Sequence, residues 1–177
     1  MWPRWLSSAP TSEQVRDMTD RAPGVSQYGS VDPAPPQPDG TFLEWQITLM
    51  DEDAPMFQRM RTVFSFRNHG SDEACLALCG AFVTSSALLR HELAYVLGQM
   101  QNSVALPTLI ERLSDPNEHI MVRHEAAEAM GAIGDRSVKH VLETHMKDPH
   151  PEVAESCEVA LDLLNWCDSA QWEQTTW

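Results

Sequence analysis

Two stretches of this sequence match each other in detail at a spacing of 33 residues. Residues 88–101 read LLRHELAYVLGQMQ and residues 121–134 read MVRHEAAEAMGAIG, so that His91 corresponds to His124 and Glu92 to Glu125. The match also includes these pairs: Ala94 and Ala127, Leu97 and Met130, Gly98 and Gly131, Leu109 and Leu142, and Leu113 and Met146. A period in the low thirties that spans two amphipathic helices is typical of repeats whose apolar faces are buried only by stacking.

The repeat predicts an all-α fold, a HEAT-like α-solenoid of antiparallel helix pairs. A weaker copy precedes the two matched segments, with Arg59 in the place of the histidine, and another follows them, with Glu155 in that place. We therefore expect HEAT-like repeats over residues 55–166 and a tail over 167–177. Residues 1–54 are expected to form an irregular arm, because the prolines in SVDPAPPQP prevent a continuous helix. For the segment TFLEWQITLMDED within that arm, the sequence does not decide between irregular structure and a short helix.

Composition limits the partners and the compartment. Twelve Lys and Arg against 26 Asp and Glu give a net charge of −14, which argues against binding to nucleic acid or to an anionic membrane. The charge suits a cationic partner, although acidity also serves solubility alone. The four cysteines contain no C-x-x-C spacing, so we expect reduced thiols. The sequence shows neither a secretory leader nor a membrane span, and a cytoplasmic location is expected.

The repeated His-Glu pair predicts a metal site. When two consecutive repeats stack, His91 and Glu92 come to lie beside His124 and Glu125, so that two imidazoles and up to two carboxylates converge. Two histidines with one carboxylate and open positions suit non-haem Fe(II), while zinc and manganese fit nearly as well. The alternative is that all four are solvated residues near helix starts, where the helix dipole favours glutamate. We expect the two imidazoles on one surface, about 3 to 7 Å apart, which is the range in which both reach one metal.

At these pairs the sequence resembles deoxyhypusine hydroxylase, a HEAT-repeat di-iron monooxygenase. The motifs YGSVDPAPP, MFQRMRTVFSFRN and ESCEVALD also resemble that family, in the family's order. The resemblance extends from about Tyr28 to Trp166 and covers only the carboxyl-terminal half of the family's length. It implies that His91, Glu92, His124 and Glu125 are the iron-site residues of this half. The four ligands of the other half have no counterpart here.

The resemblance also implies the chemistry. Members of this family use Fe(II) in a di-iron centre and O₂ to hydroxylate the deoxyhypusine side chain of translation initiation factor 5A. Since this chain carries one of two ligand sets, we expect it to need either a second copy, as a homodimer, or a separate amino-terminal half, and to be inactive alone. The alternative is a non-catalytic HEAT-repeat scaffold for protein binding, or an inactive fragment.

A few further residues carry weaker expectations. Gly98 and Gly131 interrupt helical patterns at a cost of about 1 kcal/mol each, which indicates close helix approach between repeats. Arg90 and Arg123 precede the His-Glu pairs, and helix packing explains them better than a role in the site. Three other histidines do not share a helix face and are expected to be solvated: His140, His145 and His150.

Overall fold

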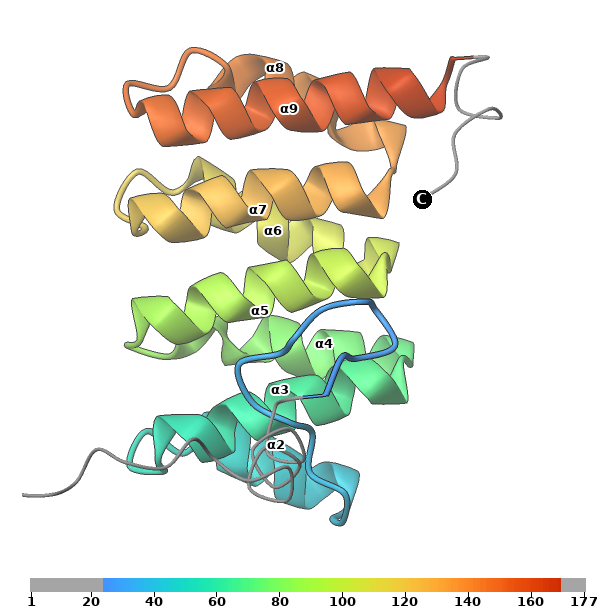
Figure 1. Ribbon diagram of the computed structural model, residues 1–177. Helices are drawn as coiled ribbons and strands as arrows, with labels where there is room; N and C mark the ends of the chain where they lie inside the picture. Colours follow the sequence, from blue (N-terminus) through green and yellow to red (C-terminus); the bar gives the residue numbers. More distant parts are fainter. Residues whose placement is uncertain (1–23, 170–177) are drawn as a thin grey trace, which may run out of the picture. The chain divides into compact units, whose positions relative to one another are not determined.

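This computed structural model describes residues 24–169 of the chain, and from Phe42 onward these residues form helices arranged largely in antiparallel pairs (Figure 1). Their bounds are α2 Phe42–Met50, α3 Met56–His69, α4 Asp72–Gly80, α5 Ala87–Met100, α6 Leu106–Ser114, α7 Ile120–Ile133, α8 Lys139–His145 and α9 Pro151–Cys167. These residues contain no strand, which confirms the predicted all-α fold. No helix among them combines the length and the apolar character needed to cross a membrane.

The helices form two layers. Helices α3, α5, α7 and α9 lie side by side in one layer, while α4, α6 and α8 run back behind them (Figure 1). Along the front layer α5 packs against both α3 and α7, and α7 packs against α9; each rear helix packs on a neighbour in front, as α6 does on α7. Helices α5 and α7 therefore each bury one face against the preceding repeat and another against the next, which is the stacking expected for a solenoid.

The helix ends are set by local sequence. Ser86 begins α5 because its side chain accepts a hydrogen bond from the Leu89 amide, and the His119 side chain accepts from the Met121 amide at the start of α7. Gly134 ends α7 with a φ of 80°, a conformation that glycine adopts without steric cost. As a result His91 and His124 occupy equivalent positions, one helical turn after the start of their helices.

Two glycines allow the front helices to approach closely. A Cβ atom built on Gly98 would lie 3.0 Å from the Cα of Ala129, and one on Gly131 would lie 2.9 Å from the Cα of Ala160. Both contacts join neighbouring repeats, α5 with α7 and α7 with α9. The expectation that these glycines serve close helix approach is confirmed.

The compact unit that holds the repeats begins at Ala34. It includes α2, the short helix whose formation the sequence did not decide. Its first residues are irregular but held against α3, because Arg61 Nε donates to the Pro35 carbonyl at 3.1 Å and the Gln37 amide donates to Ser65 Oγ at 2.8 Å. Within the other unit the described residues 24–33 contain neither helix nor strand. Residues 1–23, in the predicted arm, and 170–177, in the predicted tail, lie outside the described part.

Candidate metal centre

Three side chains from two adjacent repeats converge at the front layer. His91 Nε2 from α5 lies 3.2 Å from Glu125 Oε2 on α7, and His124 Nε2 lies 3.6 Å from the same oxygen. One ligand atom from each residue falls within 4.8 Å of the others. The two imidazole rings are nearly parallel, with centroids 6.3 Å apart, which is inside the expected range.

The three side chains of this group are polar and are partly shielded from solvent. The side chains of His91 and His124 are 29% and 21% exposed, while that of Glu125 is only 9% exposed. The hydrogen bond with Glu125 raises the pKa of His91 above its ordinary value, against the opposing effect of burial, and the charges of Glu92 and Glu128 act in the same direction as Glu125. Positive charge is therefore stabilised at this point of the surface.

The fourth predicted residue, Glu92, lies apart from the three-residue group. It is 9% exposed and follows His91 on α5, but it contributes no atom to the cluster within 4.8 Å. Its carboxylate still acts on His91 through its charge. Of the two predicted glutamates, Glu125 thus has the better geometry for a direct ligand.

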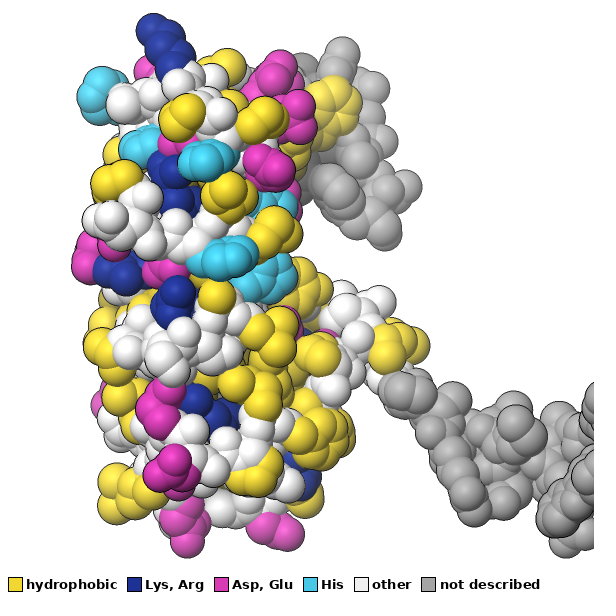
Figure 2. All heavy atoms as spheres, turned by 90° about the vertical axis from the view of Figure 1, so that its left-hand side faces the viewer, with side chains coloured by type: hydrophobic (Ala, Val, Ile, Leu, Met, Phe, Trp, Pro, Cys, Tyr) yellow, Lys and Arg dark blue, Asp and Glu magenta, His cyan; other side chains and the backbone are white. Residues whose placement is uncertain are grey.

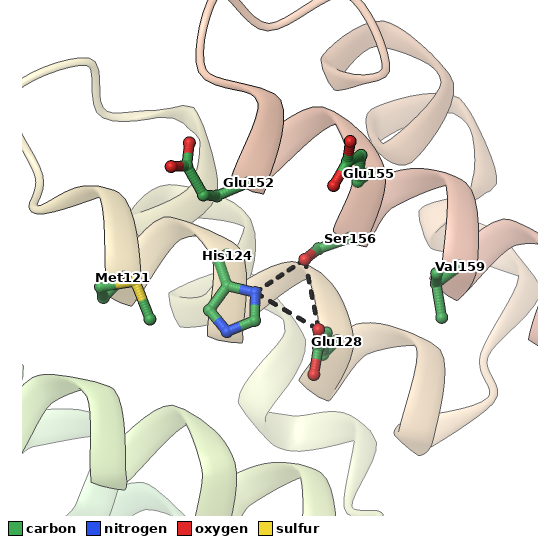
Figure 3. Close-up of a pocket in the computed structure, with 7 residues that line it drawn as sticks. All are labelled: Met121, His124, Glu128, Glu152, Glu155, Ser156 and Val159. Carbon is green, nitrogen blue, oxygen red and sulfur yellow. Dashed lines mark hydrogen bonds and ion pairs between the residues drawn. The ribbon is translucent and has the colours of Figure 1, made fainter.

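A pocket opens beside His124, between α7 and α9. Its volume is about 340 Å³, and it is lined by Met121, His124, Glu128, Glu152, Glu155, Ser156 and Val159 (Figure 3). Sequence analysis missed Ser156 and Glu128, both of which contact the Nδ1 atom of His124. The contact of Glu128 with His124 could have been predicted from the sequence, because residues four apart lie on the same face of a helix.

Histidines are prominent on one face of the molecule. Figure 2 shows cyan side chains spread from the upper part of this face down to its middle, with carboxylates and apolar side chains beside them. In Figure 1 this face corresponds to the side where α5, α7 and α9 begin. The face is therefore rich in groups that bind cations.

Comparison with known proteins agrees with this architecture. The family model described as HEAT repeats matches residues 61–162. A deoxyhypusine hydroxylase of Danio rerio is 46% identical over 169 residues, and the Homo sapiens protein of the same name is 47% identical over 141 residues. The chain belongs to the HEAT-repeat family and is a deoxyhypusine hydroxylase homologue.

The homologue spans about half the length of these relatives. The match covers 96% of this chain but 53% of the Danio rerio protein, and 80% of this chain but 47% of the human one. A solved structure of human deoxyhypusine hydroxylase in complex with glycerol superposes with a TM-score of 0.79 at 44% sequence identity. That superposition covers 84% of this chain and 52% of the human chain. The fold of the described repeats is therefore that of half of the human enzyme.

The donor atoms of this deoxyhypusine hydroxylase homologue fit a divalent transition metal. Two imidazole nitrogens and a carboxylate oxygen form a borderline-hard set that suits Fe(II), with zinc and manganese as alternatives. The set comes from the cores of two rigid helices, and its carboxylate is shielded from water. The two imidazoles remain partly exposed to solvent, at 29% and 21%.

The arginines next to the His-Glu pairs serve packing, as expected. Arg90 forms an ion pair with Glu118 at 2.8 Å, and Arg123 Nε donates to the Leu113 carbonyl at 2.9 Å. Both guanidinium groups therefore join a front helix to the rear layer or to a turn. Neither has a contact with the three-residue group among the interactions of the described residues.

One alignment made from the sequence is wrong. Arg59 was placed opposite the histidines, yet its Nε donates to the Leu49 carbonyl at 3.0 Å, ten residues earlier, just as Arg123 does to Leu113. Arg59 is therefore the counterpart of Arg123, and Met60 stands where the later repeats have histidine. The sequence alignment was one residue out because an arginine directly precedes the histidine in both repeats that carry the His-Glu pair.

The remaining candidates lie away from the cluster. His140 and His150 are not buried, whereas His145 is half-buried and its Nδ1 lies 2.9 Å from the Val141 carbonyl. None of the three belongs to the group of potential ligands found among the described residues. The four cysteines are free; Cys75 and Cys157 are buried, Cys79 is half-buried and Cys167 is exposed.

Proposed function

We propose that this chain supplies one half of a deoxyhypusine hydroxylase and binds one Fe(II) through His91, His124 and Glu125. The observation that carries the proposal is the convergence of these three donors within 4.8 Å in a chain about 45% identical to that enzyme. Glu92 completes the set of four, close enough for its charge to act on His91. Its role in the proposal is to balance the charge of the metal and of the substrate.

Within the proposal, each group of residues has a task in the reaction. Iron, when bound, supplies the activation of O₂ that hydroxylation of an unactivated C–H bond requires. The chain holds the ligands on rigid helices, and its carboxylates attract the ammonium groups of the deoxyhypusine side chain of translation initiation factor 5A. Glu128, Glu152 and Glu155 line the neighbouring pocket and add to that attraction. The net charge of −14 acts in the same direction over longer distances.

The proposed activity requires a second ligand set. This chain brings one group of His and Glu ligands, and it matches 53% or less of its relatives in these comparisons. A separate amino-terminal half supplies the missing set more readily than a second copy, because a homodimer needs a self-complementary surface. The cytoplasm suits the proposal, since its reducing conditions keep the four free thiols reduced.

Reconstitution tests this function. The purified chain is loaded anaerobically with Fe(II) and mixed with O₂ and deoxyhypusine-bearing factor 5A, with and without an amino-terminal half from a family member. We expect hypusine only when the added half is present, and about one iron in the isolated chain. Turnover by the chain alone, together with a dimeric mass, would instead support the homodimer.

The half-length match also favours a second candidate, a HEAT-repeat scaffold that binds proteins without catalysis. HEAT-type solenoids present extended surfaces for partners, and half of a di-iron site does not by itself sustain the reaction. Iron content separates the candidates. A chain that remains iron-free after loading, and inactive with the added half, is a scaffold.

A further inference from the structure

The Nδ1 atom of His124 is held by two polar side chains from different helices. Ser156 Oγ on α9 lies 2.7 Å from this nitrogen, and Glu128 Oε1, one turn further along α7, lies 3.3 Å from it. Ser156 Oγ and Glu128 Oε1 are themselves 3.2 Å apart, so the three groups form a closed triangle (Figure 3). Ser156 is only 5% exposed, and the triangle ties His124 to the following repeat.

One arrangement of hydrogens satisfies all three contacts of this triangle. An ionised carboxylate only accepts, so the single hydroxyl hydrogen of Ser156 is donated to Glu128. Ser156 Oγ must then accept from His124, which places a hydrogen on Nδ1. In the neutral imidazole the other nitrogen, Nε2, carries the lone pair, and this nitrogen is the one that faces Glu125 Oε2 at 3.6 Å.

We propose that Ser156 and Glu128 are positioning residues, which hold His124 as the Nδ1–H tautomer and direct its Nε2 lone pair toward the metal. The role at the metal rests on the proposed function. Partners of this kind on the second ring nitrogen orient metal-binding histidines and increase their basicity. The proposal adds a third helix, α9, to a site whose ligands come only from α5 and α7.

The two histidines are not held alike. The residue four positions after His91 is Tyr95, whose hydroxyl accepts a hydrogen bond from Gln99 Nε2, whereas His124 has Glu128 at that position. The contact of His91 with Glu125 uses Nε2 instead. The inference therefore applies to His124 alone, and His91 serves as an internal comparison.

Nuclear magnetic resonance of the metal-free chain tests the tautomer directly. With ¹⁵N-labelled histidine at a pH high enough to keep the rings neutral, we expect wild-type His124 to show a protonated Nδ1 and an unprotonated Nε2. The double variant Ser156→Ala, Glu128→Ala should lose this preference, and Ser156→Thr, which keeps the hydroxyl, should retain it. A wild-type spectrum with the proton on Nε2 overturns the inference whether or not any variant folds.

Metal affinity tests the consequence. In anaerobic titrations with Co(II) or Fe(II), the double variant should bind about 10- to 100-fold more weakly than wild type. Its metal-free unfolding midpoint is measured alongside, to separate affinity from folding. Glu152→Ala is the matched control, because it removes a carboxylate from the same pocket without a contact to His124 (Figure 3), and it should have a much smaller effect.

The outcomes distinguish this inference from the function on which it rests. Equal affinities of wild type and double variant overturn the positioning role and leave the proposed function standing. A wild-type chain that binds neither metal overturns the proposed function and the role at the metal together, while the tautomer is still decided by the spectrum.

Discussion

Glu92 and Glu125 are equivalent in sequence but not in position. Both are buried and both follow a histidine, yet the group of three close ligand atoms includes Glu125 and not Glu92. The Glu125 Oε2 atom lies 3.2 Å from His91 Nε2 and 3.6 Å from His124 Nε2. The difference arises because Glu125 belongs to the second of the two repeats and faces back toward the first. The proposed metal site between the two repeats would therefore take its carboxylate ligand from the second repeat.

Substitution of these two glutamates should therefore have unequal effects on metal affinity. We expect Glu125→Gln to weaken Fe(II) binding by about 100-fold or more, because it removes a ligand, and Glu92→Gln to weaken it by about tenfold, through lost charge and orientation. Calorimetric titration under anaerobic conditions measures both. Equal losses would show that both carboxylates bind the metal directly.

The convergence of His91, His124 and Glu125 was predictable because these residues belong to a repeated motif, whereas the contacts of Ser156 and Glu128 were not, because neither residue recurs. His91 and His124 recur with their glutamates at a fixed spacing, so stacking of repeats brings them together whatever the details of the turns. Ser156 and Glu128 contact His124, and Tyr95 replaces the glutamate at the equivalent place beside His91. Only the packing of α9 on α7 reveals the Ser156 contact.

The spacing of the front helices depends on Gly131. A methyl group there would lie 2.9 Å from both the Cα and the Cβ of Ala160, and backbone cannot move as a flexible side chain does. We expect Gly131→Ala to lower the free energy of unfolding by about 1 to 3 kcal/mol, despite the better helix propensity of alanine. Urea denaturation measures the change.

Gly80 provides the control for this substitution. It lies at the end of α4, and no atom comes within 4 Å of the position that an alanine methyl group would take there. The substitution Gly80→Ala should therefore leave stability unchanged or raise it by up to about 1 kcal/mol. A similar loss of stability in both variants would show that the close approach of α7 and α9 is not the cause.

Glu52 connects the turn before α3 to the turn before α5. Its carboxylate accepts hydrogen bonds from Ser85 Oγ at 2.6 Å and from Arg59 Nη2 at 2.7 Å. The bonds from Ser85, Thr84 and Arg59 lower the pKa of Glu52 from 4.5 to about 2. Because the carboxylate binds protons less readily in the folded state, its contribution to stability is complete above pH 4.5 and is lost as the pH falls toward 2.

The substitution Glu52→Gln should accordingly destabilise the chain at neutral pH, and the difference from wild type should shrink between pH 4.5 and 2. Denaturation curves across this range test the expectation. A difference that stays constant with pH would mean that the charge of Glu52 does not contribute.

The helices themselves followed from periodicity, with errors where the pattern was weak. The repeats around His91 and His124 predicted α5 and α7 because apolar residues recur on one face of each. In α3 the sequence alignment placed Arg59 opposite the histidines, whereas the bond from Arg59 to the Leu49 carbonyl makes Arg59 the counterpart of Arg123 and gives the place of the histidine to Met60. The sequence did not decide whether α2 forms, because the apolar pattern of this segment is short. Tertiary contacts hold the helix in place, such as the packing of Phe42 on Phe66, whose ring centroids lie 4.9 Å apart.

At the scale of the molecule, two stacked repeats bring the three proposed ligands together in a chain that spans about half the length of its relatives. Metal that binds the folded chain alone stabilises it by about 2.7 kcal/mol at a hundredfold excess over Kd. For a chain of this size we expect Fe(II), added anaerobically, to raise the unfolding midpoint by about 5–10 °C. The double variant His91→Ala, His124→Ala should show no such increase, and an equal increase in both proteins would place the metal elsewhere.

The most direct test is to locate the metal. Crystals of the chain grown anaerobically with Fe(II) are measured on both sides of the iron absorption edge, and an anomalous difference map then marks the iron. We predict a single peak about 2.1 Å from His91 Nε2, His124 Nε2 and a Glu125 carboxylate oxygen. A peak at other residues, or none at these three in protein that retains iron, would contradict the assignment of this site.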